Sequence, residues 1–229
     1  MPAFHKYFLL VIFLAALPRA ASAEPEAISV LADQSLSVAI TEIGRSYARH
    51  SGRIVNISYL PPQSQQKQIT EGAAGDILIT PLLQWIEELK MQGVMDVYSM
   101  TPVAKNRLAF VGPVESALAV DWEKGFPTSE LIDALHKEPG LVIGDPTLLP
   151  EGAYAKEALH ALNVTADLDP YMLYAKNMDQ MLDIITKQGG YGFFFNSAVW
   201  NRTDVRVISL VPESLHRPIQ YYAVVLAGE

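Results

Sequence analysis

Short apolar runs alternate with amphipathic segments along this chain, and the alternation restricts the fold more than any other feature. Residues 77–79 are fully apolar and are followed by a helical pattern over residues 81–91. Short strands without polar positions are typical of parallel sheets that are covered on both faces. Strands that alternate with helices favour βαβ units. The pattern therefore predicts an α/β fold.

The alternation occurs in two series, which predicts two lobes, each with a central, mostly parallel sheet flanked by helices. We expect residues 24–104, completed by residues 211–229, to form the first lobe and residues 105–210 to form the second. The chain would then cross between the lobes near residues 105 and 211. Strands are expected at residues 28–32, 54–59, 77–79, 108–111, 141–143, 173–175, 192–195, 205–210 and 221–226, and helices at residues 36–47, 65–71, 81–91, 129–136, 150–162 and 178–185.

Two of these helices have a serine where a cap is expected. Ser35 lies just before the first helix, and Ser129 lies at the start of the helix over residues 129–136. A serine hydroxyl in this position can accept a hydrogen bond from a free backbone N–H of the first turn. The apolar face of the first helix is expected to consist of Leu36, Ile40, Ile43 and Tyr47.

Residues 144–159, GDPTLLPEGAYAKEAL, join a strand to a helix. Their first three residues signal a turn after the apolar strand at residues 141–143. Pro150 suits the first helical turn, where an N–H would have no partner. The free N–H groups of that turn face the strand end and favour anions. Ligands of open α/β sheets bind at such strand ends, so the stretch is either a ligand site or an ordinary connection that binds nothing.

The first 23 residues have the features of a secretory signal peptide. Lys6 gives a basic start, residues 7–17 form an apolar core that is short for a membrane span, and residues 21–23 (ASA) form a small-residue cleavage site. We expect cleavage after Ala23, with a retained membrane anchor as the alternative. The chain has no cysteine, which excludes disulfides, thiolate metal sites and a lipid-modified cysteine. These features predict a free protein in a bacterial periplasm.

Charge and motif content exclude several classes of function. The net charge is −8, and the loss of Lys6 and Arg19 with the leader would make it −10. Such an acidic chain is a poor partner for nucleic acid or for an anionic membrane surface. The chain contains no HExxH, GxSxG, P-loop or Rossmann glycine pattern. We therefore expect no catalytic residues, no metal site and no resident cofactor.

Four stretches of the chain resemble one protein family, in the same order. They are ADQSL at residues 32–36, GAAGDILIT at residues 72–80, GDPTLLPEGAYAKEAL at residues 144–159 and PESLHRPIQYYAVVL at residues 212–226. They resemble the periplasmic molybdate-binding proteins of bacterial ABC importers, over essentially the whole mature chain. The resemblance implies the type II periplasmic binding protein fold, whose two lobes close like a clamp on a bare tetrahedral oxyanion. It also implies that neutral donors hold the anion, namely backbone N–H groups at helix starts and a few hydroxyls.

The resemblance places side-chain donors at three positions, two of which differ from the family. Ser35 matches the family's first serine, with helix capping as its alternative role. Pro62 stands where the family has a second serine, and it has neither a hydroxyl nor an N–H. Gln63 and Ser64 are the neighbours that can substitute for it. Phe195 stands where the family has a tyrosine, so that hydroxyl is missing.

The remaining contacts are backbone N–H groups at two helix starts. Glu151, Gly152 and Ala153 lie in the first turn of the helix over residues 150–162, and Met178 begins a later helix. The family has a small residue in place of Glu151. A carboxylate there would repel an anion bound at the same N–H groups, and the simplest expectation is that Glu151 points to solvent.

Together these features predict the periplasmic solute-binding component of an ABC importer. It would bind an oxyanion such as molybdate or tungstate as the transported ligand, act as a monomer, and have the importer's membrane permease as its partner. Because two hydroxyls are missing and one carboxylate is added, two alternatives stay open. One is a divergent binder of another solute, either organic, cationic or chelated. The other is a sensor that does not transport.

Overall fold

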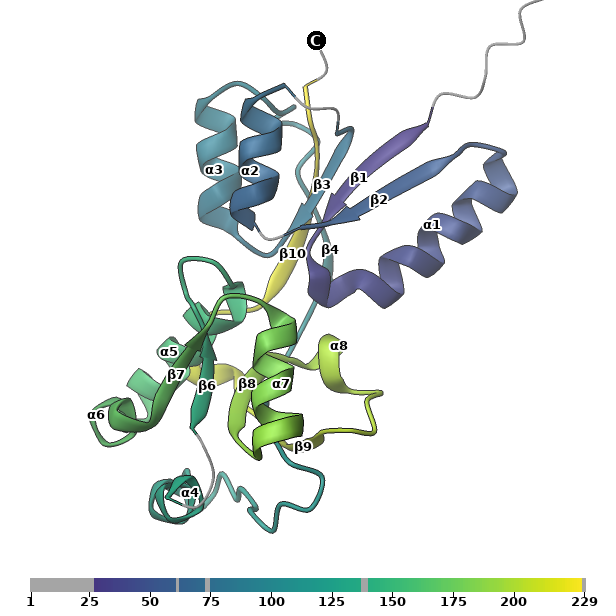
Figure 1. Ribbon diagram of the computed structural model, residues 1–229. Helices are drawn as coiled ribbons and strands as arrows, with labels where there is room; N and C mark the ends of the chain where they lie inside the picture. The colour runs from purple at the N-terminus through teal and green to yellow at the C-terminus, as the bar shows by residue number, and fades with distance from the viewer. Residues whose placement is uncertain (1–26, 61, 73–74, 137–139, 228–229) are drawn as a thin grey trace, which may run out of the picture.

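The first lobe is built on a five-stranded sheet in the order β2-β1-β3-β10-β4 (Figure 1). The computed structural model describes residues 27–60, 62–72, 75–136 and 140–227, with only the backbone at residues 62 and 63, so the expected signal peptide lies outside the described residues. The elements of this lobe are β1 (Ile28–Ala32), η1 (Gln34–Leu36), α1 (Ser37–Ser51), β2 (Val55–Tyr59), α2 (Pro62–Thr70), β3 (Ile77–Thr80), α3 (Leu83–Met91), β4 (Thr101–Lys105) and β10 (Gln220–Val225). β10 is antiparallel to both of its neighbours, whereas β1 is parallel to β2 and β3.

The second lobe repeats this plan with the strand order β7-β6-β8-β5-β9. Its elements are β5 (Leu108–Gly112), α4 (Thr128–Leu135), β6 (Leu141–Gly144), α5 (Pro150–Ala161), α6 (Thr165–Leu168), η2 (Asp169–Tyr171), β7 (Met172–Ala175), α7 (Met178–Gln188), β8 (Tyr191–Phe195), α8 (Asn196–Val199) and β9 (Arg206–Leu210). Here β5 is the strand that runs against its neighbours, while β6 is parallel to β7 and β8. One strand of each sheet therefore opposes the other four. The expected two-lobed α/β fold with mostly parallel sheets is confirmed.

Two neighbouring chain segments join the lobes. One lies between β4 and β5, at residues 106–107, and the other lies between β9 and β10, at residues 211–219, where η3 (Glu213–Leu215) forms a short turn of helix. The two segments are hydrogen-bonded, because the backbone N–H of Asn106 donates to the carbonyl of Ile219 at 3.0 Å. β4 and β10 are paired in the first sheet, so both segments leave that lobe at the same place.

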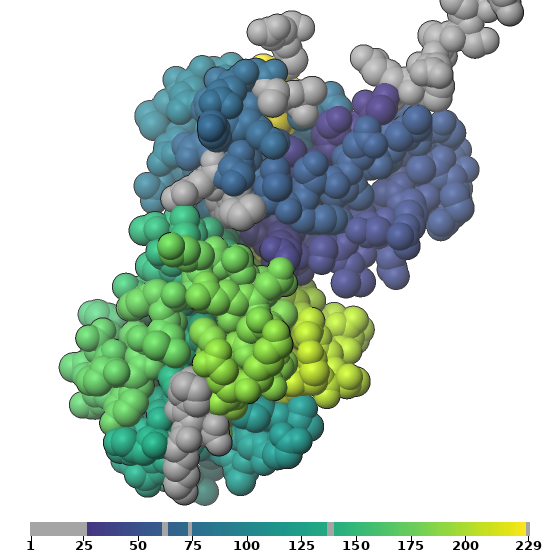
Figure 2. Space-filling model, in the orientation of Figure 1, coloured from purple at the N-terminus to yellow at the C-terminus, as the bar shows by residue number. Residues whose placement is uncertain are grey.

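Helices cover both faces of each sheet, and one hydrophobic core continues from lobe to lobe. α2 and α3 pack on one face of the first sheet, and α7 packs on one face of the second. The third and largest cluster joins Val30 and Leu36 of the first lobe to Phe110 and Phe193 of the second, through Tyr221. Figure 2 shows the lobes in direct contact. None of the described helices is long and apolar enough to cross a bilayer.

α1 packs through only part of the face expected. Leu36, just before the helix, is buried and Ile40 packs against the core, as expected. Gly44 is its buried residue, and a Cβ added there would lie 2.8 Å from the side chain of Ile57 on β2. The absence of a side chain lets the helix approach the strand at this point. Ile43 is 62% exposed and Tyr47 is 45% exposed, so their expected place in the core is wrong. The closest approach of the helix to the sheet, rather than the apolar spacing, decides which face is buried.

Both expected serine caps are also wrong. α1 begins at Ser37 without a side-chain cap, and the capping side chain of this region is that of Asp33, which accepts from the N–H of Ser35 at the start of η1. Ser129 lies inside α4, whose first residue is Thr128. β4, α6 and α8 are elements that the sequence patterns did not predict, and each is five residues long or shorter.

Candidate functional site

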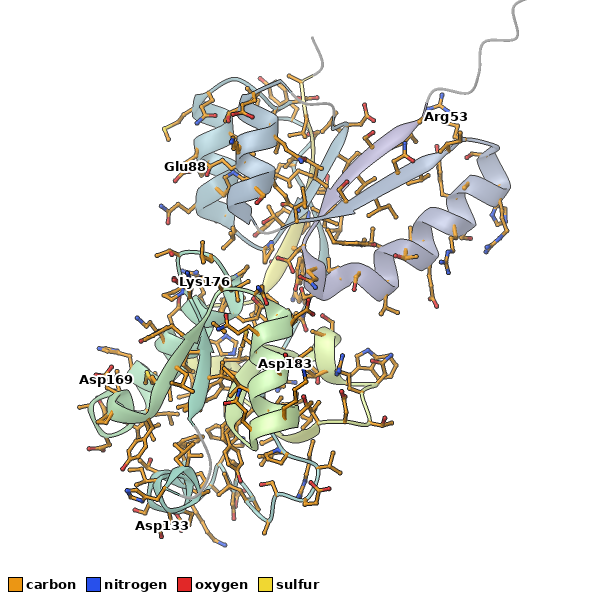
Figure 3. All side chains as sticks on the ribbon, in the orientation of Figure 1. Arg53, Glu88, Asp133, Asp169, Lys176 and Asp183 are labelled. Carbon is orange, nitrogen blue, oxygen red and sulfur yellow. The ribbon has the colours of Figure 1, made fainter. Side chains whose placement is uncertain are left out.

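Segments that follow strands of both sheets meet where the lobes touch. η1 follows β1, α5 follows β6, and α8 follows β8. The Ser197 hydroxyl of α8 donates to the carbonyl of Ser35 in η1 at 2.6 Å, so the ends of β1 and β8 are brought together across the lobes. Figure 3 places Lys176, which lies between β7 and α7, at the end of the second lobe that faces the first, and Asp133 far from it. In α/β sheets such strand ends are the usual position of a ligand.

Gly152 brings the start of α5 against the end of β6. A Cβ on Gly152 would lie 1.7 Å from the carbonyl oxygen of Gly144, which is far too close for two atoms that are not bonded to each other. Pro150 occupies the first position of the helix, as expected. The N–H of Gly152 donates to the carbonyl of Leu149 at 3.1 Å, so this N–H is already engaged inside the first turn. The glycine therefore matters because it lacks a side chain and lets the helix sit on the strand.

A buried carboxylate controls the hydroxyl of Ser35. Asp33 is 6% exposed, and its Oδ1 accepts from the backbone N–H of Ser35 at 2.9 Å and from the Ser35 Oγ at 2.5 Å. Burial raises the pKa of Asp33, and the two hydrogen bonds from Ser35 partly offset that rise. A serine hydroxyl can donate one hydrogen bond, and in this structure the Ser35 hydroxyl donates it to Asp33.

Asn106, Ser197 and Tyr221 extend this network across the junction. The Asn106 amide donates to the Ser197 hydroxyl at 2.8 Å and to the Tyr221 hydroxyl at 2.9 Å. The Tyr221 hydroxyl in turn contacts the Ser35 Oγ at 2.5 Å. Since the Ser35 hydroxyl donates its hydrogen bond to Asp33, the Tyr221 hydroxyl is the donor in this contact. The network thus links β10, the segment between β4 and β5, and α8 of the second lobe to Ser35.

Glu151 enters the junction from the second lobe. Its side chain is 2% exposed, and its Oε2 has no hydrogen-bond partner. Burial raises the pKa of Glu151 to about 8, the negative charge of Asp33 adds to the rise, and the backbone N–H of Glu151 itself counteracts it. The expectation that Glu151 points to solvent is therefore wrong. With a small residue replaced by a long one, the carboxyl extends from α5 into the space between the lobes.

The other expected site residues fall into three groups. Phe195 is fully buried, and its ring packs edge-on against Tyr154 at 5.6 Å and Tyr221 at 6.1 Å, beside the network. Met178 is the first residue of α7, but its side chain packs in the core between α7 and the second sheet. Ser64 is exposed on α2, and Pro62 begins that helix, with its side chain outside the described part of the chain.

A cavity of about 670 Å³, separate from the surroundings of Ser35 and Glu151, lies between the lobes and is lined in part by the first turn of α5. Pro81 and Gln84 line it from the first lobe, Pro146 and Ala153 line it from the second, and Arg217 lines it from the joining segment. Ala153 is the expected site residue that faces this space. Ser35, Glu151 and Phe195 do not line it, because the chain's own side chains fill the junction around them.

The family model of the bacterial extracellular solute-binding proteins matches residues 28–229. The chain belongs to this family. Among its curated relatives, the molybdate-binding protein ModA of Haemophilus influenzae is 27% identical over 204 residues, which cover 88% of this chain and 78% of that protein. ModA of Escherichia coli is 26% identical over 211 residues, which cover 91% and 80% of the two chains. The family is a class of binding proteins and not a class of enzymes.

Solved structures show the same fold. The periplasmic molybdate-binding protein of Azotobacter vinelandii superposes with a TM-score of 0.72 at 18% identity, covering 87% of this solute-binding protein and 85% of that chain. The substrate-binding domain of a putative molybdenum ABC transporter from Clostridium difficile superposes with a TM-score of 0.68 at 23% identity, covering 87% and 84%. At these identities the likeness establishes the arrangement of the two lobes.

Four polar residues of the junction were not among the expected site residues, namely Asp33, Asn106, Ser197 and Tyr221. Asp33 carried a signal, because it is a charged residue directly after a strand and inside a motif that resembles the family. Tyr221 also lies inside a stretch that resembles the family, but nothing in the chain linked it to Ser35, which is 186 positions away. Asn106 and Ser197 carried no signal. Within the described ranges, no group of three or more His, Cys, Asp or Glu side chains is arranged to hold a metal ion.

Replacing Tyr221 by phenylalanine is expected to lower the free energy of unfolding of this solute-binding protein by about 1–2 kcal/mol. The change removes the hydroxyl that bonds Ser35 and Asn106 and leaves buried polar groups without a partner. Urea denaturation measures the loss. Tyr98→Phe is the matched control, because Tyr98 is almost fully exposed, and it should change the stability by less than about 0.5 kcal/mol. Equal stabilities for the two variants would contradict the role of the network.

Proposed function

We propose that this chain is the periplasmic solute-binding component of an ABC importer and that its ligand is a tetrahedral oxyanion of the molybdate and tungstate class. Residues 1–23 would direct export and be removed, and the mature monomer would deliver its ligand to a membrane permease. The observation that carries the proposal is the match along nearly the whole chain to two molybdate-binding proteins. The meeting of Ser35, the start of α5 and the end of β8 between the lobes supports it.

The proposed site would hold the anion between the two lobes. Ser35 would donate from the first lobe, and the backbone N–H groups of Ala153 and Met178 would donate from the helix starts of the second. Helix N-termini favour negative charge because their N–H groups and the helix dipole point at the ligand. Phe195 would close one side with an apolar ring. The lobes would open to admit the ligand, since side chains of the chain itself fill the junction in this structure.

Replacing Ser35 by alanine is expected to weaken molybdate binding about 10- to 100-fold. A hydrogen bond to a charged group contributes roughly 1.5–3 kcal/mol, and each 1.4 kcal/mol is a factor of ten. Isothermal titration calorimetry at pH 6 with sodium molybdate and sodium tungstate measures the change. Asp133→Asn, on the exposed side of α4, is the control and should bind as the wild type does. Wild-type protein that binds neither anion would overturn the proposed function.

A further inference from the structure

Two buried carboxyls, one from each lobe, interact through their charges at the junction of the lobes. Asp33 comes from the first lobe and Glu151 from the second, and the charge of Asp33 acts directly on Glu151. The ion pairs of the described chain involve neither residue. We call these two groups the carboxyl pair. If both were ionised, they would repel any oxyanion at low dielectric, so the pair is an obstacle to anion binding unless it is neutralised.

Protonation of Asp33 would free the donor that the anion needs. The ionised Asp33 accepts the only hydrogen bond that the Ser35 hydroxyl can donate, at 2.5 Å. A neutral carboxyl is a weaker acceptor, so the Ser35 hydroxyl can then turn toward a ligand. Tyr221, which accepts from Asn106, still donates to the Ser35 oxygen from the other side. The same proton thus removes a negative charge and releases a hydrogen-bond donor.

Protonation of Glu151 supplies a second donor. Its Oε2 is buried and has no partner, so a proton on this oxygen would have no acceptor until a ligand arrives. A neutral carboxyl has one O–H donor. It stands in the first turn of α5, and its charge acts on Tyr221. The ring of Tyr221 packs against Phe195, the position at which the resembling family has a tyrosine. The carboxyl of Glu151 can therefore replace a lost hydroxyl, provided that it carries its proton.

The surroundings of the carboxyl pair favour its neutral forms. Burial raises the pKa of both groups, and that of Glu151 reaches about 8. From β10, Tyr221 faces the pair, and burial keeps its pKa well above 10, so it stays neutral. From α2 and α8, Gln65 and Ser197 are neutral donors to backbone carbonyls.

The nearby basic groups are engaged elsewhere. On the side of the joining segment, Arg217 pairs with Glu157 and lies over the ring of Tyr154. His216 bonds the carbonyl of Arg217 through its Nδ1 and packs edge-on against the same ring, and its buried Nε2 has no hydrogen-bond partner. Because no ion pair of the described chain reaches Asp33 or Glu151, protons are the means of neutralising the pair.

We propose that Asp33 and Glu151 form a proton-binding site coupled to the anion site, so that the oxyanion enters together with a proton that the carboxyl pair retains. The inference rests on the proposed function, because it concerns the same site. At neutral pH Glu151 already holds its proton and donates it to the ligand as a hydrogen bond. Asp33 takes up the proton that accompanies the anion. Binding therefore adds a dianion and one proton to a site that carries one carboxylate, which is a net addition of one negative charge.

Calorimetry over a range of pH tests the coupling. Molybdate and tungstate are fully ionised between pH 6 and pH 9, so any pH dependence comes from the protein. We expect the dissociation constant of the wild type to rise about tenfold per pH unit near pH 7, as the uptake of one proton requires, and more steeply above pH 8, where the free protein has also lost the Glu151 proton. Titrations in two buffers of different ionisation enthalpy should report about one proton taken up per anion at pH 7.

Variants separate the carboxyl pair from the rest of the site. The double variant Asp33→Asn with Glu151→Gln keeps the size of both side chains and cannot titrate, so it should bind with an affinity that does not change with pH. Asp133→Asn should keep the wild-type slope. Carbon-13 NMR of the carboxyl signals adds a readout that does not depend on the ligand. The signal missing in Glu151→Gln should titrate near pH 8 in the free protein.

The outcomes distinguish the inference from the function on which it rests. Wild-type affinity that is independent of pH, a double variant that keeps the wild-type slope, or a Glu151 signal that titrates near pH 4.5 would each overturn the proton site. Each of these leaves the oxyanion function standing if binding is seen. Failure of both the wild type and the double variant to bind either anion at any pH would instead overturn the proposed function.

Discussion

Replacing Glu151 by glutamine is expected to stabilise the protein at pH 7 by an amount on the order of 3 kcal/mol. In the unfolded chain this carboxyl ionises near pH 4.5, but in the folded protein burial and the charge of Asp33 keep its proton on up to about pH 8. Between those pH values folding holds a proton that the unfolded chain releases, so stability falls by up to about 1.4 kcal/mol per pH unit. Glutamine is neutral in both states and escapes this loss.

Urea denaturation at pH 4, 5.5, 7 and 8.5 checks this expectation. The wild type and Glu151→Gln should have similar stabilities at pH 4, diverge as the pH rises, and differ by a constant amount above pH 8. Asp133→Asn controls for the loss of a surface carboxylate and should follow the wild type within about 0.5 kcal/mol. Parallel curves for the wild type and Glu151→Gln would show that the carboxyl ionises normally in the folded protein.

Replacing Gly152 by alanine is expected to cost at least about 3 kcal/mol of stability. The added methyl would lie 1.7 Å from the carbonyl oxygen of Gly144 and 3.1 Å from the backbone nitrogen of Pro146. Both are backbone atoms, so the clash is relieved only if α5 moves away from β6. Overpacking that moves the backbone lies at the upper end of the usual 1–3 kcal/mol, or beyond it.

Ala153→Gly is the matched control for this change. It alters the next position of the same helical turn, removes a methyl group instead of adding one, and should cost no more than about 1 kcal/mol. Denaturation curves of both variants, with circular dichroism to verify folding, measure the difference. A Gly152→Ala protein as stable as the wild type would show that the helix start is free to shift, and that the start of α5 is not rigidly placed at the junction.

Local patterns were enough to predict the elements and their grouping. Apolar runs such as residues 77–79 and 141–143 became strands within one residue of the expected bounds, because fully buried strands have no polar positions to confuse the pattern. The turn at residues 144–146 and Pro150 predicted the start of α5, since turn chemistry acts within a few residues. Short elements were missed, as α6 and α8 have only four residues each and too few positions for a periodic pattern.

Tertiary contacts decided the faces and the caps. α1 has apolar residues on more than one side, and the approach of Gly44 to Ile57 selected the side that is buried. The expected Ser35 cap failed because Asp33, two residues before it, is the acceptor for the free N–H group. In both cases a residue outside the pattern competed with those inside it and won through geometry that the linear chain does not display.

The sequence by itself determined the α/β class, the two lobes and the helix start of α5 at a strand end, because these depend on periodicity and turn residues that act over short distances. The sequence also showed directly that Glu151 adds a carboxyl and that Pro62 and Phe195 lack the hydroxyls of the resembling family. Only the tertiary structure decided that Glu151 is buried, that Asp33 accepts the hydrogen bond of the Ser35 hydroxyl, and that the charges of the two carboxyls interact. The physical reason is that desolvation and charge interaction depend on which atoms surround a group. For this carboxyl pair the neighbours come from opposite lobes and from a strand near the C-terminus.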